Sequence, residues 1–270
     1  MNPALRPRLS YVHKPGRHSR LALGAAALVA LLGLWYVATS ATHVLPAVYF
    51  PTPAEVGGAL RQIAVQGYAD GRLHQHFLHS VWLVLMGFVV AVGTGVPLGL
   101  LMGWSRRAEA LVNPVFLLLR PIPPLAWIPL AIVWLGLGDA AKVLVIWFAA
   151  FVPSVINSYA GVRSIEPHLI EAARSLGVSR AMLVREVLFP GALPLIFTGL
   201  RLSLQACWTT LVAGELIGAI LGLGHVLYQA GLDLFPAMIV VGMVFVAIGG
   251  ASMTAVLGWL EARAMPWHAR

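Results

Sequence analysis

Long apolar runs alternate with short polar segments along most of the chain. Predominantly apolar runs occupy residues 21–39, 77–103, 143–160, 191–216 and 236–257. An α-helix rises about 1.5 Å per residue, so runs of this length can cross the roughly 30 Å of hydrocarbon in a bilayer. We therefore predict a membrane-spanning helix from each of these five runs.

A sixth apolar region, residues 108–137, has a different pattern. Its prolines are Pro114, Pro121, Pro123, Pro124 and Pro129. Proline removes a backbone donor and clashes with the preceding turn, so this region cannot form one straight helix. We predict a kinked span there, and for the whole chain an all-α polytopic membrane protein with six transmembrane helices.

The connections between the runs are short or broken by proline and glycine. We predict a surface helix at residues 53–66, a turn at Asp70-Gly71 and a glycine-containing loop at residues 221–235.

Three histidines, His74, His76 and His79, follow that turn. Their spacing could suit a metal ion on a helix, but no carboxylate or cysteine completes the set. We interpret them as polar residues of the membrane interface and predict no metal site.

Composition agrees with a membrane protein. Apolar residues make up 59% of the chain and charged residues 10%, whereas a soluble domain carries about 25% charged residues. The single cysteine, Cys207, lies within an apolar run. It excludes an internal disulfide and is expected to be a small buried residue.

Basic residues are distributed unevenly over the polar segments. With six spans both termini lie on one side, together with thirteen basic residues: Arg6, Arg8, Lys14, Arg17, Arg20, Arg106, Arg107, Arg163, Arg174, Arg180, Arg185, Arg263 and Arg270. The other side holds Arg61, Arg72 and Lys142. Cytoplasmic loops carry the excess of Lys and Arg. We therefore predict a disordered cytoplasmic tail at residues 1–20, a transmembrane domain at residues 21–260 and a second cytoplasmic tail at residues 261–270. The net charge of +8 then reflects membrane topology, and we predict no binding of nucleic acid.

One polar segment, residues 164–190, separates two spans on the predicted cytoplasmic side. Pro167 suits a first helical turn, Gly177 interrupts the pattern and Ser179 is placed to cap a second helix. Pro190 either stops that helix or starts the next element. We predict two short amphipathic helices that either lie in the lipid interface or dock on a soluble partner.

The residues of this segment resemble the signature of ATP-binding-cassette (ABC) importer permeases. The family's spacing is kept. Glu171-Ala172-Ala173 is followed after three residues by Gly177, and after nine more residues by Val187-Leu188-Phe189-Pro190. Val187 and Phe189 stand where the family has Ile and Leu. The resemblance implies a type I permease whose coupling helix seats in a groove of a cytoplasmic ATPase. The coupling residues would be Glu171, Ala172, Ala173, Arg174, Leu176 and Gly177.

The likeness extends to a second block. Residues 120–130 read Arg-Pro-Ile-Pro-Pro-Leu-Ala-Trp-Ile-Pro-Leu, similar to the taurine, alkanesulfonate and nitrate subfamily. This resemblance implies a bacterial inner-membrane homodimer with two ATP-binding subunits and a periplasmic or lipid-anchored substrate-binding protein. The implied substrate is a small anionic or zwitterionic sulfonate, taurine foremost. Nitrate, bicarbonate and a thiamine-precursor pyrimidine are the alternatives.

Ionisable groups within the spans are candidates for the translocation pathway, because such groups are costly in lipid. They are Arg120, Arg201 and Glu215, and Gln205 and Thr209 share a helix face with Arg201. Arg201 either extends to the interface or lines the pathway. Arg120 either caps carbonyls freed at the kink or faces an anionic substrate. For Glu215 we expect a hydrogen bond to a neighbouring span or to the dimer mate.

No catalytic constellation or phosphate-binding loop occurs in the sequence. We therefore predict a transport subunit, not an enzyme, that binds no cofactor itself, with ATP and Mg²⁺ on the partner chain. A secondary transporter working without ATP is the rival hypothesis, and it predicts an inverted repeat. The sequence shows no convincing repeat.

Overall fold

The computed structural model describes residues 17–41, 46, 49–216 and 218–267, and within them helices form and strands do not. Contacts divide the chain into two units, residues 1–57 and 58–270. Residues 1–16 of the predicted basic tail and residues 268–270 lie outside the described residues.

The first unit contains the predicted first span. Helix α1 (Arg17–Tyr36) continues as a π-helical turn, η2 (Val37–Ala41). Helix α2 (Pro53–Arg61) begins with a capping box in which the Thr52 N–H donates to Glu55 Oε2 (2.7 Å) and the Glu55 N–H donates to Thr52 Oγ1 (3.3 Å). The π-helix η3 (Gln62–Gln66) continues α2, so the surface helix predicted at residues 53–66 is confirmed.

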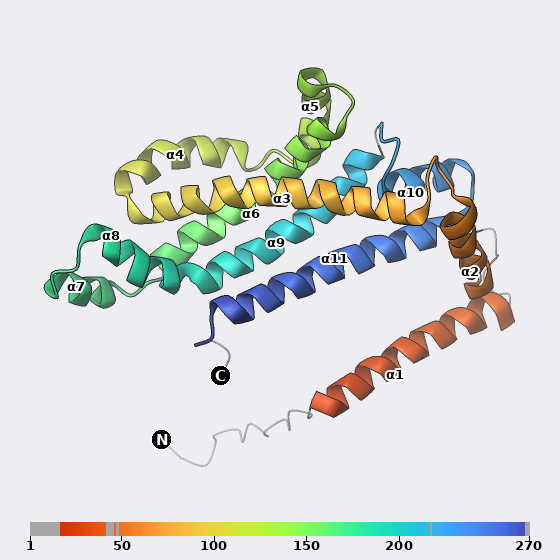
Figure 1. The fold of residues 1–270 in the computed structure, drawn as a ribbon, viewed down its shortest axis with the longest axis horizontal. Helices are drawn as coiled ribbons and strands as arrows, with labels where there is room; N and C mark the ends of the chain where they lie inside the picture. The colour runs from red at the N-terminus through yellow and green to blue at the C-terminus, as the bar shows by residue number, and fades with distance from the viewer. Residues whose placement is uncertain (1–16, 42–45, 47–48, 217, 268–270) are drawn as a thin grey trace, which may run out of the picture. The chain divides into compact units, whose positions relative to one another are not determined.

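Four long helices form the core of the second unit and run side by side (Figure 1). They are α3 (Leu73–Trp104), α6 (Asp139–Arg163), α9 (Phe189–Glu215) and α11 (Pro236–Ala264). Each is long and apolar enough to cross a membrane. They confirm four of the predicted spans and extend beyond most of the predicted ends. Because α11 continues to Ala264, the tail predicted to begin at residue 261 is helical in its first turn.

Small residues let these helices approach closely. A Cβ at Gly95 would lie 2.8 Å from Ser154 Cβ of α6, and one at Gly99 would lie 2.5 Å from the Val155 carbonyl oxygen. The Ser154 and Ser203 hydroxyls are 2.8 Å apart and join α6 to α9. In lipid, where no hydrophobic force draws helices together, such close packing supplies much of the association.

The proline-rich region is sharply bent, as predicted, and forms either a broken span or a re-entrant loop. Helix α4 (Arg106–Leu119) is followed by a 3₁₀ turn, η4 (Pro124–Trp127), and by α5 (Ile128–Leu135). The two arms are bent by 85°. The described residues thus contain five helices that can span a membrane, or six spans if the bent pair counts as one.

The connections include one correction. The predicted loop at residues 221–235 contains a helix, α10 (Leu223–Leu232), whose first-turn N–H groups are held by side chains of α3 and α9. Pro190 starts the next element, one of the two alternatives that we predicted, because it lies in the first turn of α9. The helical stretch is not interrupted there, since α8 (Arg180–Leu183), the π-helix η5 (Val184–Leu188) and α9 follow one another directly.

Candidate functional site

The coupling segment turns sharply at a glycine. Helix α7 (Pro167–Ser175) ends in a Schellman motif: the Val178 N–H donates to the Ala173 carbonyl (3.2 Å) and the Gly177 N–H to that of Arg174 (3.0 Å). Gly177 has φ +72°, the left-handed conformation that this motif requires. Ser179 then caps α8 by accepting from the Met182 N–H at 3.3 Å. The predicted pair of short helices around Gly177 is thus present.

The tip of this segment exposes apolar side chains. Leu176 is 83% exposed, Met182 54% and Leu169 49%. Ala173 is buried, whereas Ala172 and Arg174 are exposed. Among the described residues, the Glu171 carboxylate joins none of the ion pairs. An exposed apolar knob with an unpaired carboxylate beside it suits docking on another protein.

The base of the segment is anchored in the core of the second unit. Leu188 is 2% exposed and belongs to the main hydrophobic cluster, and Ile165 and Ile170 pack against it. Arg163, the last residue of α6, pairs with Glu109 of α4, which also accepts a hydrogen bond from the Tyr159 hydroxyl. The segment thus packs against the core that contains α6 and α9, and α6 is joined to α4 by the Arg163–Glu109 pair.

The helices of the second unit bring the basic residues to one end. The end of α3, the beginning of α4, the end of α6, the coupling segment and the end of α11 lie toward the same end of the bundle (Figure 1). They carry Arg106, Arg107, Arg163, Arg174, Arg180, Arg185 and Arg263. Arg72 and Lys142, at the beginnings of α3 and α6, lie toward the other end. The folded bundle thus keeps the charge separation found in the sequence.

Three of the predicted pathway residues share one cavity. Arg201, Gln205 and Thr209 of α9 line a groove of about 560 Å³ together with residues of α11. The Arg201 guanidinium pairs with the Glu261 carboxylate of α11. The structure therefore joins Arg201 to a residue that the apolar pattern places in the tail.

Arg120 lies elsewhere. It is the exposed C-cap of α4 and lines a separate cavity of about 190 Å³. In that cavity Trp127 stacks on Phe148 with ring centroids 4.2 Å apart. Arg120 and Arg201 are thus not brought into one site within a single copy of the chain.

Glu215 forms the centre of a buried polar network. It is 0% exposed, and its carboxylate accepts from the Ser80 hydroxyl (2.8 Å) and the Gly224 N–H (2.7 Å). The bond to a neighbouring span that we expected from the sequence is present in Ser80 of α3. Since both carboxylate oxygens are occupied, Glu215 holds helices together and does not face the groove.

His76 and Ser80 complete this network. Ser80 Oγ accepts from the Leu223 N–H at 2.9 Å, and His76 Nδ1 accepts from the Gly222 N–H at 3.1 Å. His76 Nε2 therefore carries the ring proton and donates to the Tyr68 carbonyl at 3.0 Å. The residue is neither a metal ligand nor an interface residue, which corrects our interpretation of it. No metal-binding group of three or more ligands occurs in the described part of the chain.

Tyr68 closes the network at the surface. Its hydroxyl donates to Asp233 Oδ2 at 2.5 Å. Burial, and then the hydrogen bond to Asp233, raise the pKa of Tyr68 above its usual range. The hydroxyl thus stays protonated as a donor and ties the turn before α3 to the end of α10.

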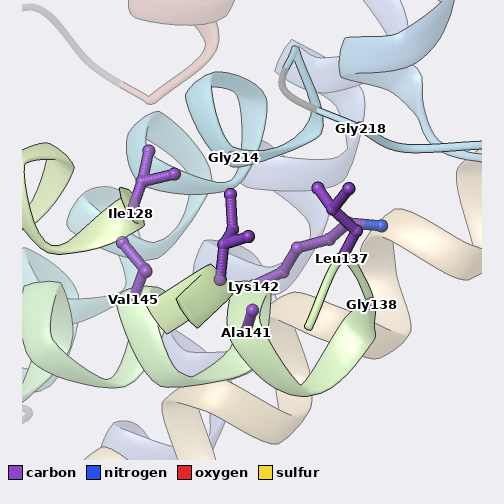
Figure 2. A pocket seen from close by; sticks show the side chains of 9 residues that line it. Ile128, Leu137, Gly138, Ala141, Lys142, Val145, Gly214 and Gly218 are labelled. Carbon is purple, nitrogen blue, oxygen red and sulfur yellow. The ribbon is translucent and has the colours of Figure 1, made fainter. Parts of the chain in front are cut away.

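A small cavity lies near Glu215 (Figure 2). It is lined by Lys142, Leu137, Gly214 and mostly apolar residues, and has a volume of about 20 Å³. The Lys142 side chain runs along it toward Leu137 and pairs with Asp139 at 3.1 Å. Because this space holds about one water molecule, it cannot admit a solute.

Comparison with known proteins identifies the family. Residues 95–266 match the family described as the binding-protein-dependent transport system inner membrane component. The chain belongs to this family. It is a permease component of an ABC importer of the taurine, sulfonate and nitrate type, a multi-pass membrane protein and not an enzyme.

Two curated relatives resemble the permease over nearly all of its length. The taurine transport system permease protein TauC of Escherichia coli (strain K12) is 38% identical over 97% of this chain and 94% of its own. The putative aliphatic sulfonates transport permease protein SsuC of Bacillus subtilis (strain 168) is 31% identical over 94% of this chain and 91% of its own.

A solved structure shares the fold. A chain of the MetNI methionine ABC transporter, in an inward-facing conformation, superimposes with a TM-score of 0.61 at 23% identity. The match covers 73% of the permease and 96% of that chain. At this identity the likeness concerns the fold alone.

The apolar pattern did not point to Glu261, His76 and Ser80 as partners in these sites, nor to Trp208, which lines the same groove as Arg201. The signal for Glu261 was its distance from the end of the run: it lies four residues beyond residue 257, one helical turn further along the same helix. His76 and Ser80 are likewise four residues apart and share a face of α3.

Proposed function

We propose that the permease imports a small sulfonate, with taurine as the foremost candidate. The observation that carries this proposal is the 38% identity to the taurine permease over 97% of the chain. The block at residues 120–130 supports the same subfamily. Nitrate, bicarbonate or a pyrimidine precursor remain the alternatives within it.

The proposed assembly contains two copies of this permease, two ATP-binding subunits on the cytoplasmic side and an external binding protein. ATP and Mg²⁺ would be bound by the partner subunits. The exposed tip around Leu176 would seat in the ATPase, and closure of the ATPase dimer would displace residues 166–188. The buried base of the segment supports this route, because Leu188 packs in the core that also contains α3 and α6.

The substrate is tested with the binding protein encoded beside this gene. Titration with taurine, other sulfonates and nitrate ranks the ligands, and the reconstituted complex is then assayed for uptake of the best one. We expect taurine uptake that requires both ATP and the binding protein. Preference for nitrate would contradict the substrate, and uptake by the permease alone on an ion gradient would contradict the importer.

The coupling role is tested at residues 171 and 177. We expect Glu171→Lys, which reverses the charge beside the exposed tip, and Gly177→Val to reduce co-purified ATPase and stimulated ATP hydrolysis at least about tenfold, because the docking geometry is lost. Both variants should still insert in the membrane.

Gly136→Val is the matched control for the glycine variant. Gly136 has φ +77°, and at Gly136 as at Gly177 an added Cβ would meet only open space. Gly136 has ψ 175°, in a region that is essentially restricted to glycine, so Gly136→Val carries at least the backbone cost of Gly177→Val, but Gly136 lies after α5. ATPase binding at wild-type levels in Gly177→Val and Glu171→Lys would refute the role of the segment.

A further inference from the structure

The groove between α9 and α11 has donors on successive turns of one helix. Arg201 lies at one end, Gln205 one turn further, and Trp208 and Thr209 about two turns further, and Thr254 faces them from α11. Arginine, tryptophan and the hydroxyls can all donate hydrogen bonds, and no carboxylate lines the groove itself. The Thr209 and Thr254 hydroxyls already donate to the Gln205 and Gly250 carbonyls, so the side chains that offer free donors to an anion in the groove are Arg201 and, one turn further along α9, Gln205.

Trp208 forms part of the wall of this groove. It is 6% exposed, and its Nε1–H has no hydrogen-bond partner among the described residues. The six-membered ring packs on Gly249, and Nε1 would lie 3.9 Å from a Cβ at Gly250, another residue that lines the groove. A buried N–H without an acceptor is costly, but this nitrogen has almost no accessible surface, so Trp208 contributes its ring to the groove wall and not a donor to a solute.

The end of the groove carries both signs of charge. The Arg201 side chain is 52% exposed and pairs through one terminal nitrogen with one oxygen of Glu261, which is 22% exposed. A guanidinium has five N–H donors and a carboxylate has two oxygens. Each partner therefore keeps unused hydrogen-bonding capacity: Arg201 lines the groove itself, and Glu261 lies next to the groove through its contact with Arg201.

We propose that the Arg201–Glu261 pair recognises the two charged ends of a zwitterionic aminosulfonate during translocation. The sulfonate binds Arg201 and the ammonium binds Glu261, so the internal ion pair is exchanged for two ion pairs with the solute. This inference rests on the proposed import of a sulfonate and assigns the selectivity of that pathway.

Charge balance is the reason for this preference. A zwitterion adds no net charge, and both protein charges remain paired when it is bound. A plain sulfonate or nitrate would occupy Arg201 and leave Glu261 without a cation in a partly buried site, which is unfavourable. The pathway is thus expected to discriminate against solutes that lack the ammonium group.

The test compares uptake of taurine and ethanesulfonate, which lacks the ammonium group, by the complete complex in proteoliposomes. The same binding protein is present throughout, so a change in the uptake ratio belongs to the permease. We expect Glu261→Gln to lower the taurine-to-ethanesulfonate ratio about tenfold, the scale of one hydrogen bond to a charged group. Arg201→Gln should reduce uptake of both solutes.

Two further variants separate recognition from structure. Glu109→Gln removes the other inter-helix Arg–Glu pair, that of Arg163, and should leave the ratio at its wild-type value. Glu261→Asp keeps a carboxylate and should keep the ratio closer to wild type than Glu261→Gln does, even where total uptake falls.

Equal losses for both solutes in Glu261→Gln, or the same change of ratio in Glu109→Gln, would overturn this inference alone. A phospholipid held in the groove of the purified complex, with the ratio unchanged in every variant, would assign the groove to lipid. A wild-type complex that moves neither solute would overturn the proposed substrate together with this inference.

Discussion

Glu215 shows how one buried acid can serve a membrane protein without touching a solute. Its carboxylate accepts from Ser80 of α3 and from Gly224 at the beginning of α10. The first N–H groups of a helix lack partners within the helix and carry a partial positive charge. The acid at the end of α9 therefore stabilises the beginning of α10, and Ser80 and His76 satisfy the two preceding N–H groups.

Replacing Glu215 should destabilise the permease in a graded manner. In Glu215→Gln an amide nitrogen, which can only donate, replaces one of the two acceptor oxygens. It then faces either the Gly224 N–H or the Ser80 hydroxyl, whose oxygen already accepts from the Leu223 N–H. One hydrogen bond is therefore lost, at a cost of about 1–2 kcal/mol. Glu215→Ala loses both bonds and leaves a cavity, at a cost of about 3 kcal/mol. Thermal unfolding of the purified protein should rank wild type above Gln and Gln above Ala.

Glu186→Gln is the control, because the Glu186 side chain is 59% exposed and its ion-pair partner among the described residues is the exposed Arg185. It should unfold at the wild-type temperature, since exposed ion pairs contribute little. If Glu215→Ala unfolded at the wild-type temperature too, the network would not hold α10.

At the scale of elements, the contact between α3 and α6 depends on glycines along one face of α3. A Cβ at Gly99 would lie within 2.5 Å of a backbone oxygen and 2.7 Å of Ser158 Cβ. Backbone atoms cannot move aside as a flexible side chain can, so even a methyl group must separate the helices.

Gly99→Ala should therefore destabilise the protein by about 1–3 kcal/mol through overpacking. Gly93→Ala in the same helix is the matched control, because an added Cβ there would have nothing within 4 Å of it. Alanine has a better helix propensity than glycine by about 1 kcal/mol, so Gly93→Ala should be neutral or stabilising. Unfolding temperatures of the two variants measure the difference, and equal values would show that the helix contact is not tight.

Much of the architecture could be predicted from the apolar runs and the prolines. The spans, the kinked region and the turn at Gly177 follow from local properties: length, proline geometry and glycine conformation. Helix α10 could not be found in this way, because its residues include two glycines. Its first turn is stabilised by side chains from helices distant in the sequence, a tertiary effect that no local pattern contains.

The candidate site was predictable only in part for the same reason. Helical spacing places Arg201, Gln205 and Thr209 on one face, and the groove contains all three. The partner of Arg201 is 60 residues away at Glu261, and the separation of Arg120 from this groove depends on the 85° bend. Both facts require the packed helices.

At the scale of the whole molecule, the polar segments assign the two ends of the bundle different roles. One end carries the coupling segment, with its exposed Leu176, and most of the described basic residues of the polar connections. The other carries the buried network of Glu215, His76 and Ser80 that joins α3, α9 and α10. The end that we propose to contact the ATP-binding subunit is thus exposed and charged, whereas the opposite end is held together by buried hydrogen bonds.

This assignment predicts which end faces the cytoplasm. In a Cys207→Ala background, which removes the single native thiol, a cysteine at Arg180 should react with a membrane-impermeant maleimide only after the membrane is opened. A cysteine at Asp70, exposed at the other end of the bundle, should react in intact cells. The physical reason is the bias of Lys and Arg toward the cytoplasm.

The same cysteine variants also test docking. Co-expression of the ATP-binding subunit should slow labelling of Arg180→Cys in opened membranes, because the coupling segment would then be covered, and should leave Asp70→Cys unchanged. Labelling of Arg180→Cys from outside intact cells would reverse the proposed orientation. An unaltered labelling rate beside a bound ATPase would instead place the contact elsewhere on the cytoplasmic surface, away from the turn at Gly177.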